Sequence, residues 1–400
     1  MTRSSFLTSL RLRWASLLLF WQRLPLLDRW LIAELTGPLL FGIAAFTAVS
    51  LSVGVVFELV RKVAEAGLPP LVAMQVLSLR LPGFLVLSFP MATLMATLLG
   101  YSRLSGSSEL TALRSLGVST RRIVMPALMV ASLMTLLTFF FNDVVVPSAN
   151  LAAANTLDAA LGRAIASEKG SNVVYSRFGP VLIQEAESLR TDHGLAQLFY
   201  ARESTSGGMK DVTVLDFSRA GQRQVLVADT ATWNDARSMW EFRQGRLFTI
   251  DRLSGRTTSA EFDRYFYPFT SAPIDVASLP KSAEQMTVAQ AVRAERLLAG
   301  AGDYKEARRL RVRIQEKFAF PTICLVFGLI GSSLGVRPNS RTSRSQGFGI
   351  SVLLIFGYYL MSFIFSSLGI KGALTPFFAA WLPVLIGLAA GVYLLRQASR

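Results

Sequence analysis

The stretch GFGISVLLIFGYYLMSFIFSSLG, residues 347–369, contains no charged side chain along its whole length. A bilayer hydrocarbon core about 30 Å thick needs about twenty apolar residues for a helix to cross it. Stretches of similar character lie at 36–58, 78–101, 122–143, 318–336 and 374–395. The 400-residue chain is 17% charged, whereas soluble domains are usually about 25% charged. The sequence therefore predicts a membrane α-helical fold with six transmembrane helices.

The positive charge of the chain is concentrated beside the predicted spans. Residues 1–149 contain 12 Lys and Arg against 6 Asp and Glu, and residues 318–400 contain 6 against 0. Residues 150–280 contain 14 basic residues against 15 acidic ones. This balance argues against nucleic-acid binding, because a nucleic-acid-binding domain would carry a basic patch. Loops on the side of the two termini hold 14 Lys and Arg against 3 on the opposite side, and basic loops stay in the cytoplasm. We therefore expect both termini to be cytoplasmic and residues 146–310 to lie outside.

The first thirty residues combine arginines with apolar residues at helical spacing. Leu7, Leu10, Trp14 and Leu18 recur every three or four positions, which is typical of a helix lying flat in the membrane interface. No small-residue cleavage site of a signal peptide follows them. We predict a cytoplasmic amphipathic segment over 1–30, with a partly ordered tail as the alternative.

Between the third and fourth predicted spans the sequence changes to short strand-like runs. Such runs lie at 172–176, 181–185, 212–217, 224–228, 239–243 and 246–250. The Gln244–Gly245 pair predicts a hairpin turn between the last two. Seven or eight strands at this spacing favour an antiparallel sandwich or jelly roll. We therefore expect an inserted extracytoplasmic antiparallel β domain, a β-jellyroll, with helical linkers at 148–165 and 287–317.

The residue content argues against several kinds of chemistry. The single histidine, His193, lies in a predicted turn far from the single cysteine, Cys324. Neither a His/Cys metal site nor a Cys–His catalytic pair is therefore available. The sequence also contains no G-x-x-x-x-G-K-[S/T] nucleotide-binding loop. We expect a chain that is not an enzyme and has no cofactor of its own, so that any ATP and magnesium would bind to a separate ATPase subunit.

The loop between the second and third spans contains a short helix signal at 105–117. Ser107 or Gly106 can cap its start, Glu109 lies in its first turn, and Gly117 can end it in a left-handed conformation. Three leucines are expected to share one face of this helix: Leu110, Leu113 and Leu116. Such a helix suits docking into a groove on an ATPase. A helix that lies on its own membrane domain is the alternative.

Basic residues are predicted near the outer ends of the first two spans. Glu58 and Lys62 are four positions apart and can pair on one helix face, with Arg61 beside them. Arg80 lies at the outer edge of the second span. Lys and Arg are the expected partners of phosphate. The three basic residues therefore predict a cationic site for an anionic lipid headgroup, with side chains that snorkel to the membrane surface as the alternative.

Four motifs, in this order, resemble the lipopolysaccharide export permease family (LptF/LptG). They are Leu27-Asp-Arg-Trp-Leu-Ile32, Phe57-Glu-Leu-Val-Arg-Lys62, Phe89-Pro-Met-Ala-Thr-Leu-Met-Ala-Thr-Leu-Leu-Gly100 and Ser108-Glu-Leu-Thr-Ala-Leu-Arg-Ser-Leu-Gly117. The family also shares the layout of three spans, an outer domain and three further spans. The resemblance covers residues 27–396, nearly the whole chain.

The resemblance implies a half-permease of an ATP-driven exporter in the bacterial inner membrane. A second copy or a paralogue would form the other half, and the pair would sit on a dimer of a cytoplasmic ATPase. It would extract lipopolysaccharide, or a similar anionic glycolipid, from the outer leaflet and pass it to a periplasmic bridge protein of jellyroll fold. By position, Glu109 would contact the ATPase within a coupling helix, and Arg61 and Lys62 would face lipid phosphates.

The predicted organisation has four parts. These are a cytoplasmic segment (1–30), spans one to three with the coupling helix (31–146), a periplasmic β domain with its linkers (147–310) and spans four to six (311–400). Two other interpretations remain open: a permease that acts on lipoproteins by transmitting motion across the membrane, and a membrane sensor or scaffold that transports nothing. A lipid-modifying enzyme is disfavoured because the sequence contains no catalytic constellation.

Overall fold

The computed structural model describes residues 25–160, 171–185, 188–205, 208–218, 222–235, 237–251, 255–269, 272–277, 279, 282–336 and 344–399. Most of the predicted amphipathic segment and the end of the first linker lie outside these ranges. Within them, six helices are long and apolar enough to cross a membrane. They confirm the membrane α-helical fold that was expected from hydropathy.

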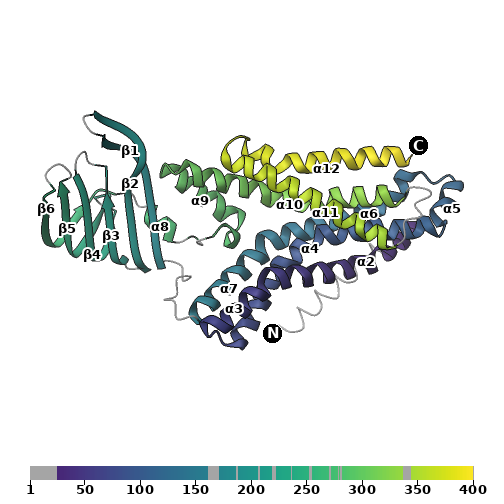
Figure 1. Cartoon of the computed structure of the whole chain (residues 1–400), viewed down its shortest axis with the longest axis horizontal. Helices are drawn as coiled ribbons and strands as arrows, with labels where there is room; N and C mark the ends of the chain where they lie inside the picture. Colours follow the sequence, from purple (N-terminus) through teal and green to yellow (C-terminus); the bar gives the residue numbers. More distant parts are fainter. Residues whose placement is uncertain are drawn as a thin grey trace, which may run out of the picture.

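The six candidate spans are built from ten helical segments of the described chain. They are α2 (Leu26–Leu51), η1 (Ser52–Val56) and α3 (Phe57–Ala66); α4 (Pro70–Gly106); α6 (Thr120–Phe140), η2 (Phe141–Val145) and α7 (Val146–Ala160); α10 (Tyr304–Gly335); α11 (Arg344–Lys371); and α12 (Pro376–Ala398). η1 and η2 are single π-helical turns inside longer helices. A short helix, α5 (Glu109–Ser115), joins α4 to α6 and lies at the end of the bundle remote from the sheet (Figure 1).

Close backbone contact holds the centre of the helical bundle together, where α10 packs against α4, α6 and α12. A Cβ atom on Gly331 would lie 2.2 Å from Thr97 Oγ1 and 2.9 Å from the Leu94 carbonyl oxygen. One on Gly335 would lie 2.6 Å from the Cβ of Tyr101. Apolar side chains do not drive helix association in lipid, so small residues that let backbones approach are the usual solution.

Two ion pairs fasten the end of the bundle that carries α5. Arg122 of α6 binds Asp28 of α2 in a bidentate pair, with Nη1–Oδ1 at 2.5 Å and Nη2–Oδ2 at 2.9 Å. Asp28 is only 2% exposed, so its charge depends on this partner. Arg103 of α4 lies 2.6 Å from Glu34 of α2. Each pair joins two different helices, and neither was predicted.

Between the third and fourth spans the described residues form one antiparallel sheet of six strands in sequence order. The strands are β1 (Ser171–Glu185), β2 (Ser188–Thr205), β3 (Gly208–Asp216), β4 (Gln222–Asn234), β5 (Met239–Asp251) and β6 (Thr257–Tyr267). The predicted inserted antiparallel β domain is therefore confirmed. The strands number six rather than seven or eight because β1 and β5 each join two of the predicted short runs.

The hairpin predicted at Gln244–Gly245 is wrong, because β5 continues through both residues and pairs with β4 and β6 on either side of them. Gln244 has a φ of 51°, so the local backbone does resemble that of a turn. A Cβ on Gly245 would lie 2.3 Å from the Val227 carbonyl oxygen of β4 and 2.6 Å from Cζ of Phe262 on β6. The glycine makes room for both neighbouring strands instead of reversing the chain.

The sheet curls so that aromatic residues of distant strands meet on its inner face. The rings of Phe199 on β2 and Trp240 on β5 are 5.0 Å apart, although β3 and β4 lie between them. Tyr175 on β1 meets Phe269, which follows β6, at 5.8 Å in an edge-to-face contact. All four side chains are buried. The domain therefore has its own aromatic core, separate from the helical bundle.

Three short segments carry the chain from the sheet back to the bundle: α8 (Ala272–Ala277), η3 (Ala283–Gln285) and α9 (Val288–Gly300). Asp143 of η2 accepts a hydrogen bond from the Val288 N–H at 2.7 Å, and Lys317 Nζ donates to the Met286 carbonyl at 2.7 Å. α10 then continues without a break into the fourth span, as predicted for the second linker.

The turn between α9 and α10 also binds the β domain directly. The Phe178 N–H of β1 donates to the Ala301 carbonyl at 2.6 Å, next to a register shift between Arg177 and Phe178. Gly302 has a φ of 80°, and a Cβ there would lie 2.5 Å from the Phe178 carbonyl oxygen. Only glycine fits both the backbone conformation and the close approach. The fourth span is therefore linked to the sheet through one tight contact.

Candidate functional site

Three of the predicted site residues lie where α3 meets α4. Lys62 Nζ is 2.5 Å from Glu58 Oε1, and Arg80 Nη1 is 3.7 Å from Glu58 Oε2. The predicted Glu58–Lys62 pair is confirmed, and the structure adds Arg80 to the same carboxylate. Arg61 is exposed beside them. We call these four residues the outer cationic cluster.

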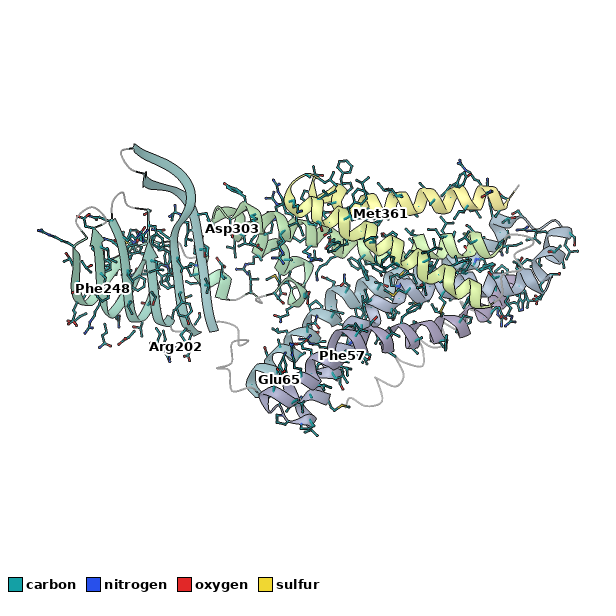
Figure 2. All side chains as sticks on the ribbon, in the orientation of Figure 1. Phe57, Glu65, Arg202, Phe248, Asp303 and Met361 are labelled. Carbon is teal, nitrogen blue, oxygen red and sulfur yellow. The ribbon has the colours of Figure 1, made fainter. Side chains whose placement is uncertain are left out.

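The chain reversal between α3 and α4 brings Arg80 back beside Glu58. Gly67 has a φ of 66°, and the Leu68 N–H donates to the Lys62 carbonyl at 3.3 Å, which is a left-handed helix ending that favours glycine. Pro70 then occupies the first position of α4, where a missing N–H costs nothing. Figure 2 shows Phe57 and Glu65 at this end of the bundle, opposite the end that carries α5.

The outer cationic cluster keeps a positive charge, because Lys62 and Arg80 share the single carboxylate of Glu58 and Arg61 adds a third basic side chain. Lys62 and Arg80 are 23% and 33% exposed, so both remain reachable from outside the bundle. Arg61 forms no ion pair within the part of the chain that the structure describes. Exposed guanidinium and ammonium groups in this arrangement can bind phosphate or carboxylate.

The N-cap of the short loop helix is Ser108, whereas Ser107 or Gly106 was predicted. Gly106 is the last residue of α4, and Ser108, with a φ of 63°, precedes Glu109 without a side-chain cap. Ser107 instead donates its hydroxyl hydrogen bond to the Glu109 carboxylate at 2.6 Å. Gly117 ends the helix with a φ of 84°, as predicted. The Glu109 side chain is thus held at the start of α5.

The three leucines predicted to share one face do not all have the same surroundings, and Leu116 is the C-cap residue of α5. Leu110 is 1% exposed within the core of the helical bundle, and Leu113 packs partly against that core. Leu116 is 80% exposed. The helix therefore rests on its own bundle through Leu110 and Leu113, while Leu116 is exposed.

Arg114 links α5 to the end of the fourth span. Its Nη2 donates to the Val336 carbonyl, which follows α10, at 2.8 Å, while its Nε is buried and has no hydrogen-bond partner among the described residues. Burial lowers the pKa of this guanidinium. A displacement of α5 would therefore act on α10 directly. Sequence reasoning missed this contact because the two residues are 222 positions apart, and no local spacing records it.

The fold and these sites define a multi-pass membrane protein in which a β domain is inserted between two sets of three spans. The family model for the lipopolysaccharide export system permease LptF/LptG matches residues 29–397. The chain therefore belongs to the LptF/LptG permease family. No individually curated protein matches it. The resemblance seen in the sequence motifs is thus confirmed over nearly the whole chain.

Proposed function

We propose that the chain is one half of an ATP-driven exporter that removes lipopolysaccharide, or a related anionic glycolipid, from the inner membrane. The observation that carries this proposal is the outer cationic cluster in a chain of the LptF/LptG family. Its cations lie at one end of apolar helices, which suits a ligand with anionic groups and acyl chains.

The proposed complex contains a second copy or a paralogue as the other half, and a cytoplasmic ATPase dimer that binds ATP and magnesium. Both termini and α5 face the cytoplasm, and the β domain lies in the periplasm beside a bridge protein that receives the lipid. The distribution of basic residues supports this orientation. A reporter fused near residue 220 that is active in the cytoplasm would overturn it.

A chain of contacts supports a mechanism for the coupling of ATP hydrolysis to lipid release. Movement of α5 reaches α10 through Arg114 and Val336, and α10 leads to the Gly302 turn against Phe178 of β1. We infer that closure of the ATPase collapses a cavity lined by spans one, two and five. The lipid then leaves toward the β domain, because the outer end of the bundle is the end joined to the sheet.

The central test is to purify the chain with its native lipids and subunits, and then to measure ATP-driven lipid release from proteoliposomes. Mass spectrometry is expected to find a separate ATPase and a phosphorylated glycolipid. Isolation of an intact complex with neither would overturn the proposal. Release of a bound lipoprotein instead of a glycolipid would also contradict it.

Two charge reversals test the ends of the proposed pathway. Arg61→Glu removes an exposed cation without breaking the Glu58–Lys62 pair, and it is expected to weaken lipid crosslinking about tenfold. Lys371→Glu, at the outer end of α11, is the control.

Glu109→Lys is expected to leave the fold intact but to uncouple ATP hydrolysis from lipid release, and Glu306→Lys is its control. Equal effects of a variant and its control would contradict the assigned role.

A further inference from the structure

Interruptions in the first and third spans lie at one level of the bundle, where both meet α4. A Cβ on Gly54, in the π-helical turn η1, would lie 2.8 Å from Cε1 of Phe84 on α4. A Cβ on the neighbouring Gly83 would lie 3.8 Å from Cγ1 of Val146, the residue that follows η2. The two π-helical turns therefore flank the same turn of α4.

All three helices are also easy to bend at this level. A π-helical turn breaks the regular i→i−4 hydrogen-bond ladder, and helices kink at such turns and at prolines. Pro82 and Pro90 lie inside α4 on either side of Phe84, and neither has an N–H to donate to the preceding turn. In hinged proteins a few such positions absorb the bend, while the structure on either side moves as rigid units.

The hydrophobic core of the bundle divides at the same level. Phe84 packs against one buried cluster, whereas the next residue, Leu85, packs against another that contains Phe89. The first cluster joins α3, the start of α4 and α7, at the end of the bundle opposite α5 (Figure 1). We call α3, residues 67–84 and α7 the outer module. Its fully buried residues, with Val55 of η1, are Leu59, Leu68, Val76, Ala153 and Leu157.

The outer module carries all four residues of the outer cationic cluster. They are Glu58, Arg61 and Lys62 on α3 and Arg80 on α4. The Glu58–Arg80 ion pair and the hydrogen bond from the Leu68 N–H to the Lys62 carbonyl fasten these two helices to each other. A bend at the level of η1 and η2 would therefore move the four residues together.

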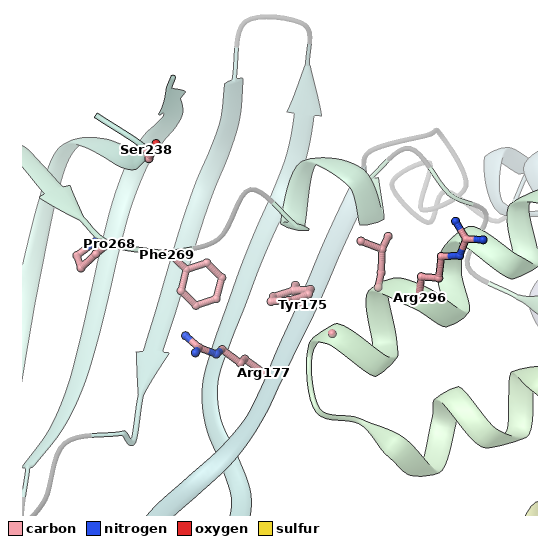
Figure 3. A pocket seen from close by; sticks show the side chains of 8 residues that line it. Tyr175, Arg177, Ser238, Pro268, Phe269 and Arg296 are labelled. Atoms are coloured by element: carbon pink, nitrogen blue, oxygen red, sulfur yellow. The ribbon is translucent and has the colours of Figure 1, made fainter. Parts of the chain in front are cut away.

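The segment that returns from the β domain touches both the interruption in the third span and the outer module. Asp143 of η2 accepts a hydrogen bond from the Val288 N–H at 2.7 Å, and Asn150 of α7 donates one to the Glu284 carbonyl at 3.4 Å. Further along this segment a cleft of about 500 Å³ lies between the sheet and α9, with Tyr175 on the sheet and Arg296 on α9 (Figure 3). The cleft leaves room for the sheet to tilt, and the two hydrogen bonds would carry such a tilt to the outer module.

We propose that η1, η2 and the Pro82–Pro90 stretch of α4 form one hinge, on which the outer module tilts as a rigid body. The tilt moves the outer cationic cluster relative to the rest of the bundle, and the return segment couples it to the β domain. The inference rests on the proposed function only for its purpose, because the cluster that moves is the proposed lipid site. The hinge itself depends on this chain alone.

Double electron–electron resonance on the full chain in nanodiscs tests the hinge, with Cys324→Ser as the background. Nitroxides at Glu65→Cys and Leu353→Cys, which are exposed on the outer module and on α11, are expected to give a broad distance distribution. A second pair, Glu65→Cys and Ala159→Cys, lies within the outer module and is expected to give a narrow one. Equal widths for the two pairs would overturn the proposal.

A proline series identifies where the bend occurs. Pro82→Ala combined with Pro90→Ala restores two backbone donors to α4, and it is expected to narrow the 65–353 distribution to the width of the 65–159 pair. Pro126→Ala removes a proline from inside α6, away from the hinge, and is expected to leave the distribution broad. The same narrowing in both variants would contradict a hinge at this level.

Lipid release by the assembled transporter separates this inference from the proposed function. If release proceeds normally while both label pairs give equally narrow distributions, the hinge is wrong and the proposed function stands. If the wild type releases no lipid but the distribution across the hinge is broad, the proposed function fails and the hinge stands.

Discussion

The helical bundle and the β domain are both tightly packed, but they reach this state with opposite kinds of residue. Where α10 meets α4, glycines let the backbones approach until no Cβ fits. On the inner face of the sheet, Trp240, Phe199 and Phe242 fill the space and are almost fully buried. The difference follows from the solvent. In water the burial of apolar surface stabilises a fold, whereas in lipid apolar side chains gain little from meeting each other.

The largest expected effect lies in the β domain. Trp240→Ala is expected to destabilise it by about 4 kcal/mol, because a large aromatic side chain is removed from a closed core. Tryptophan fluorescence during denaturation would measure this change. Cys324, buried in the bundle, is expected to stay protected from maleimide. Val227→Ala, on the more exposed face of β4, is the control. Loss of Cys324 protection in Trp240→Ala would show that the two cores are not independent.

The reverse experiment adds volume to the bundle. Gly331→Val is expected to destabilise the bundle by about 3 kcal/mol, because its side chain would overlap Thr97 and the Leu94 carbonyl. Faster maleimide labelling of Cys324 would report the effect. Gly357→Val is a matched control on α11, where a Cβ would meet nothing within 4 Å. Equal labelling of the two variants would show that close backbone contact does not hold the bundle together.

A smaller effect is expected where the two regions join. Gly302→Ala and Gly255→Ala both place alanine at positive φ, which costs about 1–2 kcal/mol. Only the alanine at position 302 would also clash with the Phe178 carbonyl oxygen, because its Cβ would lie 2.5 Å from that atom. Hydrogen exchange of the Phe178 amide is therefore expected to accelerate in Gly302→Ala and to stay unchanged in Gly255→Ala. Unchanged exchange in both would remove this turn from the proposed pathway.

The smallest effect concerns charge in the water-facing region. Arg264 and then Arg243 hold the pKa of Glu241 at about 2, below its ordinary value of 4.5. A lowered pKa contributes stability that is complete above pH 4.5 and is lost as the pH falls toward 2. The melting temperature of the β domain is expected to decrease over this interval, and less so in Glu241→Gln. Because both arginines are more than half exposed, salt is expected to reduce the difference.

Several local features could be predicted because neighbours in sequence produce them. The Glu58–Lys62 pair follows from a four-residue spacing on a helix, and the end of α5 follows from the left-handed conformation of Gly117. The hairpin prediction at Gln244–Gly245 failed although the same kind of local signal was present. There the neighbouring strand, with Phe262 against Gly245, determines what the glycine does.

The sequence by itself determined the six spans, the inserted β domain and the family. These depend on the length of apolar runs relative to bilayer thickness and on the order of motifs, which are properties read along the chain. Only the tertiary structure decided which charges remain available. Arg122 is bound to Asp28, Arg80 and Lys62 share Glu58, and Arg61 stays exposed beside them. Ion pairs form over a few ångströms in space, and such distances depend on how separate helices and strands pack.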